Sequence, residues 1–81
     1  MRHNEKRERN NAMTIDLVSG LTGKQVSAKY GLSEPRVREI VFRICADIAE
    51  QKGFSDLALV PTVRLCRKYA NEIKSELSNA L

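Results

Sequence analysis

The segment from Thr22 to Ile44 constrains the fold of this chain more than any other part of its 81 residues. Thr22 and Gln25 have the Thr-x-x-Gln spacing of a helix-capping box, which predicts that a helix starts there. Gly31 follows a short helical stretch, where a glycine ends a helix at little cost because it accepts a positive φ. Ser33 is then placed to cap a further helix. We therefore expect two helices joined by a tight turn.

Apolar residues in the second of these helices repeat at helical spacing. From the first of them they recur at i+3, i+4, i+7, i+8 and i+11, which is the strongest periodicity in the chain. They are Val37, Ile40, Val41, Ile44, Cys45 and Ile48. Pro35 is tolerated in the first turn because the N–H groups there have no partner within the helix. We expect the helix to end at Gly53, with Phe54 packing back on it.

The remaining segments also predict helices, and none predicts a strand, because no β-branched residues alternate with polar ones. A first helix is expected from about Arg9 to Ser19, with Gly20 as its C-cap. A short helical turn is expected within residues 55–60, and a last helix from about Thr62 almost to the end of the chain. No internal repeat is evident. The predicted fold is all-α, with a three-helix helix-turn-helix core and an additional C-terminal helix.

The length is that of one small domain, which we divide into three parts. Residues 1–8 mix charges without an apolar stripe, so we expect a flexible arm. Residues 9–53 form the helix-turn-helix core. Residues 54–81 form a helical extension that packs on the core or makes a dimer contact.

The last predicted helix carries a narrow apolar stripe at alternating steps of three and four. Its members are Val63, Cys66, Ala70, Ile73, Leu77 and Ala80. This stripe has two interpretations: it covers the open side of the three-helix core, or it forms the seam of a homodimer. We favour the core. We still expect a homodimer, because the chain is small and other apolar residues, Leu65, Tyr69 and Leu81, are left over.

Basic side chains gather along the second helix of the central pair. When its apolar stripe is buried, helical geometry of about 100° per residue leaves an outward face between two basic edges. The face consists of Pro35, Glu39, Phe42 and Ala46, and the edges carry Arg36, Arg38 and Arg43. Residues 22–44 hold five cations and two anions, and so three of the four net positive charges of the chain. This pattern is typical of a helix in the DNA major groove, with short-range readers at its centre and cations facing the phosphates.

We therefore expect the chain to bind double-stranded DNA. The residues expected to contact DNA are Lys24, Lys29, Ser33, Glu34, Arg36, Arg38, Glu39, Phe42 and Arg43. Some of them have a second interpretation. Glu39 accepts from a cytosine amino group or pairs with Arg43 at i+4. Phe42 touches a thymine methyl or, as we favour, packs under the C-terminal helix. The arginines could also form an ordinary solvated face.

The stretch GLTGKQVSAKYGLSEPRVREI resembles the helix-turn-helix of region 4 in bacterial housekeeping sigma factors, above all from Ser33 to Ile40. Phage and plasmid regulators have similar spacing. The resemblance spans about residues 9–44. It implies a helix that reads promoter DNA, with Arg36 and Arg38 on the family's basic positions and Glu39 where a base-reading side chain is expected.

Two departures separate this chain from that family. Glu34 and Pro35 stand where sigma factors present an arginine and a glutamate to the bases, and a proline has no donor to offer. We therefore expect a different target sequence. The segment from Phe54 to Leu81 has no counterpart after the recognition helix of that family. Both departures favour an autonomous small regulator, bacterial or phage, over a fragment of a sigma factor.

Other classes of function find little support in the sequence. The two cysteines lie on apolar faces and His3 is the single histidine, so we expect no zinc site, no metal and no cofactor. No nucleophile, acid–base pair or phosphate loop indicates an enzyme. No run is long and apolar enough for a membrane span, and we expect a cytoplasmic protein. The alternative function is a helical adaptor that binds RNA polymerase or another regulator without touching DNA.

Overall fold

The computed structural model describes the backbone of residues 2–80 and the side chains of residues 6–78. Over that range the chain is all-helical, as predicted, without a strand. The helices are α1 (Arg2–Val18), α2 (Gly23–Tyr30), α3 (Glu34–Lys52), α4 (Ser55–Leu59), α5 (Val63–Lys68) and α6 (Ala70–Ala80).

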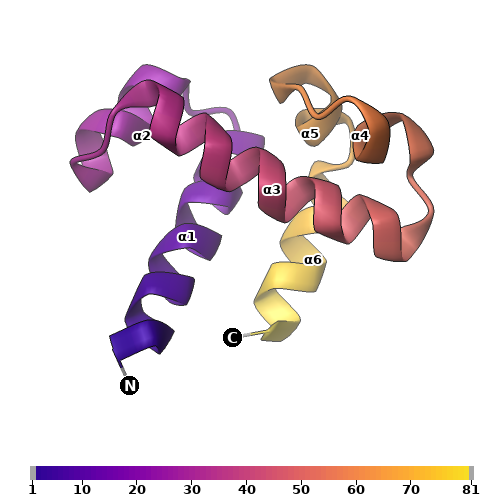
Figure 1. Cartoon of the computed structure of the whole chain (residues 1–81), viewed down its shortest axis with the longest axis horizontal. Coiled ribbons are helices and arrows are strands. Elements are labelled where there is room, and N and C mark those ends of the chain that lie inside the picture. Colours follow the sequence, from indigo (N-terminus) through magenta and orange to yellow (C-terminus); the bar gives the residue numbers. More distant parts are fainter. Residues whose placement is uncertain (1, 81) are drawn as a thin grey trace.

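The longest helix, α3, is the centre of the fold and contacts each of the other helices (Figure 1). α1 and α6 pack against each other below it in this view, α2 lies at its beginning, and α4 and α5 lie above its C-terminal half. Every helix contributes to a single core, whose fully buried side chains include Met13, Leu17, Val26, Val37, Val41, Cys45, Leu57, Cys66 and Ile73. The fold therefore depends on contacts between its two ends.

The first helix is longer than the sequence indicated. α1 begins at Arg2 instead of Arg9, so the segment expected to be a flexible arm is helical from residue 2. The segment contains no glycine or proline, and arginine, lysine and glutamate are good helix formers. The missing apolar stripe misled the prediction, because this part of α1 borders the groove beside α3 with polar side chains, among them Lys6 and Asn10.

The last helix is interrupted where the sequence predicted continuity. Thr62 caps α5 as expected, since its hydroxyl accepts from the backbone N–H of Leu65 at 3.1 Å. The helix stops at Tyr69, whose φ of −106° and ψ of 25° depart from helical values, and α6 starts at the next residue. The Tyr69 ring stacks on Phe54, so a contact with a distant part of the chain accompanies the break.

The apolar stripe of this C-terminal region covers the core of its own chain. Cys66, Ile73 and Leu77 are buried in the single molecule. These three members of the stripe therefore pack in the core of the chain, whereas the side chain of Ala80 lies outside the described residues. Cys66 and Cys45 are free thiols, and hydrogen bonding to Cys66 together with burial raises the pKa of Cys45.

A cluster of three polar side chains joins α1 to α2. Asp16 accepts hydrogen bonds from Lys29 Nζ at 2.8 Å and from Tyr30 Oη at 2.7 Å. Burial alone would raise the pKa of Asp16, but these two hydrogen bonds and the lysine charge outweigh it, and the pKa is lowered. The cluster fixes the end of α2 against α1.

A second cluster of the same kind joins α4 to the end of α5. Asp56 accepts from Lys68 Nζ at 3.0 Å and from Tyr69 Oη at 2.8 Å, and these bonds lower its pKa. The residues of the two clusters recur in the same order along the chain. Asp16, Leu17, Thr22, Lys29 and Tyr30 correspond to Asp56, Leu57, Thr62, Lys68 and Tyr69. This correspondence is hard to see in the sequence because few positions match and the second copy is one residue shorter.

Candidate nucleic-acid interface

The connection between α2 and α3 is a tight turn at Gly31. This glycine has φ 69° and ψ 32°, the left-handed conformation that the sequence predicted. The carbonyl of Ser27 accepts from the N–H groups of Gly31 at 2.9 Å and Leu32 at 3.2 Å, and the Ser27 hydroxyl donates to the Leu32 carbonyl. These bonds satisfy the end of α2 and set the direction in which α3 departs.

Both helices begin with the caps expected from the sequence. The Thr22 hydroxyl accepts from the Gln25 N–H at 3.1 Å, and the Gln25 side chain accepts from the Thr22 N–H at 2.9 Å. The Ser33 hydroxyl accepts from the N–H of Arg36 at 3.3 Å, with Pro35 in the first turn. Ser33 is therefore the N-cap of α3 and has a structural role in the turn.

The two faces of α3 separate as the sequence indicated. Val37, Val41 and Cys45 are fully buried, and Ile40 and Ile48 nearly so. The opposite side of the first half of the helix exposes Pro35 and the charged side chains of Arg36, Arg38, Glu39 and Arg43. Phe42 is half-buried and packs against the core, so it is not a fully exposed side chain of this face.

Ion pairs hold two of the three arginines along the helix. Arg36 pairs with Glu39 three residues later, and Arg38 pairs with Glu34 at 3.6 Å. The partner of Glu39 is thus Arg36, and not the Arg43 that the i+4 spacing offered. All four side chains remain between 42% and 55% exposed, so these pairs are weak and open to exchange with another partner.

One flank of α3 faces the start of α2. The Arg38 guanidinium lies beside Gly23, the first residue of α2. A Cβ added to Gly23 would be 3.5 Å from Nη1 of Arg38. Lys24 is exposed on the same helix. This flank brings two cations next to the N-terminal end of α2, where the helix dipole also favours an anion. Lys29 is farther along α2 and is engaged with Asp16.

The other flank of α3 borders a groove of about 180 Å³ shared with α1. Its lining consists of Lys6 and Asn10 from α1 and of Arg36, Glu39, Ile40, Arg43 and Ile44 from α3. Lys6 and Asn10 were missing from the sequence prediction. No sequence signal pointed to them, because their place beside α3 depends on the helical start of α1.

The basic residues of α5 have mainly structural partners. Arg67 donates to the carbonyl of Leu17 through Nε at 3.2 Å and to that of Leu21 through Nη2 at 2.9 Å. Lys68 is paired with Asp56 at 3.0 Å. Arg64 has no such bond or ion pair within residues 6–78, and it lines a separate cavity with Lys68.

Neither a metal centre nor a membrane span is found in the part of the chain that the structure describes. No three His, Cys, Asp or Glu side chains come together there as a metal site requires. None of the helices there has the length and apolar character needed to cross a bilayer. In comparisons with known proteins, no protein-family model, no curated protein and no solved structure matches this chain.

Proposed function

We propose that this chain is a small transcriptional regulator that binds double-stranded DNA with the first half of α3 in the major groove. The observation that carries the proposal is the exposed face of α3 between residues 35 and 43, which has arginines on both edges and a buried apolar side behind it. A helix is about 10–12 Å across with its side chains, and the major groove is about 12 Å wide. The turn at Gly31 supports a helix-turn-helix.

The two flanks suit the two phosphate walls of the groove. Arg38 and Lys24 lie on the side of α2, and Arg36 and Arg43 lie on the side of α1. We assign these cations mainly to phosphates, with Arg38 as a second base reader, and Glu39 between them to a base edge. Lys29 contributes less, because its charge is balanced by Asp16.

The charge distribution along α3 supports entry by its N-terminal half. Beyond Arg43 the exposed side carries Asp47 and Glu50, which would repel DNA phosphates. Counting all charged side chains, residues 34–43 carry three arginines and two glutamates, a net +1, and residues 44–52 carry one lysine and two carboxylates, a net −1. This asymmetry limits the proposed contact to roughly residues 33–43.

A second candidate function rests on the end of α4. Leu59 is 80% exposed and its neighbour Val60 is 62% exposed, so two large apolar side chains stand next to each other at the surface. Such a pair favours the alternative of a helical adaptor that contacts a protein such as RNA polymerase. A regulator that recruits polymerase would use both surfaces, whereas a pure adaptor would use this one alone.

The main experiment compares the wild-type chain with a variant in which Arg36, Arg38 and Arg43 are all alanine. Preferred duplexes are first selected from a random pool, and binding is then measured to a selected and a scrambled duplex at several salt concentrations. We expect the triple variant to lose binding to both, with a salt slope shallower by up to about 0.9 for each phosphate that is no longer neutralised. Lys74→Ala, on α6, is the matched control. Unchanged DNA affinity in the triple variant would contradict the DNA-binding proposal and favour the adaptor function.

Glu39→Ala separates base reading from phosphate binding. We expect the preference for the selected duplex over its variant at one base pair to fall by about 1–3 kcal/mol. Binding to the scrambled duplex should not weaken, because the substitution removes a negative charge and releases Arg36 from its ion pair. A uniform decrease in affinity for all duplexes would contradict the assignment of Glu39 to a base edge.

A further inference from the structure

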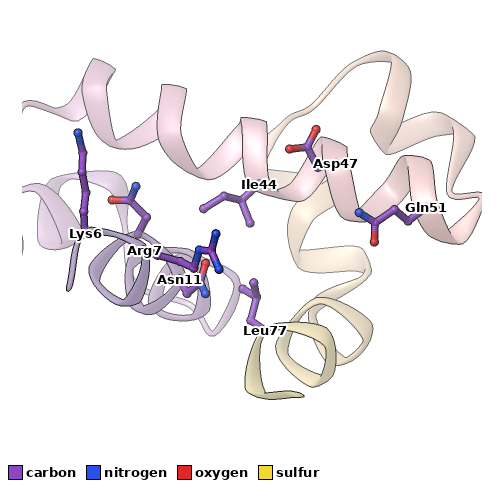
Figure 2. Close-up of a pocket in the computed structure, with 8 residues that line it drawn as sticks. Lys6, Arg7, Asn11, Ile44, Asp47, Gln51 and Leu77 are labelled. Carbon is purple, nitrogen blue, oxygen red and sulfur yellow. The ribbon is translucent and has the colours of Figure 1, made fainter. Parts of the chain in front are cut away.

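The groove between α1 and α3 brings together cations that are distant in the sequence. Lys6 comes from the first turns of α1, and Arg36 and Arg43 come from α3, with the Asn10 amide beside them. In Figure 2 the Lys6 side chain extends from α1 toward the N-terminal half of α3. The single carboxylate of this lining, Glu39, is paired with Arg36. The groove thus keeps an excess of positive charge.

We propose that Lys6, Asn10 and Arg43 together hold one backbone phosphate of the DNA, so that α1 is part of the interface. This inference rests on the proposed function. A lysine ammonium supplies a compact charge, an arginine supplies a planar set of donors, and an amide N–H₂ supplies a neutral donor. These are the groups that bind phosphate oxygens in protein–DNA complexes. No base edge is assigned to them.

The neighbouring cavity shows why the phosphate belongs at this end of the groove. That cavity, of about 580 Å³, shares Lys6, Asn10 and Ile44 with the groove and continues toward α6 (Figure 2). The residues that it does not share with the groove are Arg7 and Asn11 of α1, Asp47 and Gln51 of α3, and Leu77 of α6. A phosphate would be repelled by Asp47, whereas the end beside Arg43 attracts it.

The arrangement also requires little ordering on binding. Lys6 stands on a helix that packs against α3, so its backbone is already placed when DNA arrives. A cation on a flexible arm would have to be ordered at binding, at a cost in conformational entropy. A Lys6 contact should therefore contribute like the other phosphate contacts of the interface.

The first test measures DNA binding by Lys6→Ala at several salt concentrations. We expect affinity to fall by the same factor for the selected and scrambled duplexes, and the salt slope to decrease by about one unit. Lys6→Arg should retain most of the binding, and Lys74→Ala should behave as wild type. Thermal unfolding of each variant checks that the fold is intact, since Lys6 is exposed.

A double-mutant cycle then tests whether Lys6 and Arg43 share a phosphate. The losses of binding free energy caused by Lys6→Ala and Arg43→Ala should be non-additive in the double variant. Those caused by Lys6→Ala and Arg38→Ala should be additive, because the two side chains lie on opposite flanks of α3. If Lys6→Ala binds as wild type while the triple arginine variant does not bind, this inference is wrong and the proposed function stands.

If the triple variant also binds DNA as wild type, the proposed function fails. Inorganic phosphate is then titrated into the chain and followed through the NMR amide signals of Lys6, Asn10 and Arg43. Saturable shifts at these residues would show that they form a phosphate site whose ligand is free phosphate and not DNA. Their absence would overturn the inference.

Discussion

The ring of Tyr69 lies flat on the ring of Phe54, with centroids 4.1 Å apart and planes inclined by 6°. The Tyr69 hydroxyl also donates to Asp56 at 2.8 Å, so this side chain joins α4 to the break between α5 and α6 in two ways. Tyr69→Phe keeps the stack and should cost about 0.5–1.5 kcal/mol in unfolding free energy. Tyr69→Ala should cost more, because it removes the ring stack as well as the hydrogen bond. Urea denaturation of both variants measures this, and equal costs would mean that the stack contributes nothing.

Gly31 provides a test of the turn between α2 and α3. Its φ of 69° is strained for a β-branched residue, so Gly31→Val should lower the unfolding free energy by more than about 1 kcal/mol. A Cβ there would meet no neighbouring atom within 4 Å, so the cost comes from the backbone alone. Gly31→Asn should cost less, because asparagine accepts this conformation more readily. A valine variant with the wild-type melting temperature would contradict this explanation.

Leu77 tests the contribution of α6 to the fold. It is only 5% exposed, and it contributes to the core and to the edge of the cavity in Figure 2. Leu77→Asp would place a carboxylate there and should destabilise the chain by at least about 2 kcal/mol. Ser78→Asp, on the exposed neighbour, is the matched control. Chemical denaturation compares the two, and similar stabilities would show that α6 is dispensable for the core.

The pH dependence of stability should reflect the two aspartates. The pKa values of Asp16 and Asp56 are lowered in the folded chain, so the unfolded chain binds more protons at acidic pH. Their stabilisation is present above the unfolded pKa of about 3.9 and disappears as pH falls through the lower folded values. Asp16→Asn and Asp56→Asn should each make the unfolding free energy less dependent on pH below about pH 4. Identical acid profiles for wild type and variants would refute this.

Local signals in the sequence predicted the parts of the fold that local chemistry decides. The caps at Thr22 and Ser33 and the turn at Gly31 each involve residues within a few positions of one another. The buried side of α3 follows from periodicity in the same way. These predictions are confirmed, and each depends on groups that lie close together along the chain.

Distant contacts decide what the sequence could not predict. The break at Tyr69 accompanies its stack with Phe54, and the place of Lys6 depends on the packing of α1 beside α3. The partner of Glu39 is a matter of rotamers, since Arg36 and Arg43 both lie within reach along one helix. Of the residues that line the groove between α1 and α3, the sequence therefore indicated the exposed arginines of α3 but not Lys6 and Asn10 of α1.

The bonds from Arg67 to the carbonyls of Leu17 and Leu21 have a consequence for biosynthesis. A ribosome releases the chain from its N-terminus, so α1, α2 and α3 emerge before α5. Until Arg67 follows, the segment that joins α1 to α2 lacks these two donors. A nascent chain that ends before α5 would carry the proposed DNA-reading helix on an incompletely anchored hinge. Complete anchoring of the segment between α1 and α2 is thus a late event in the synthesis of this protein.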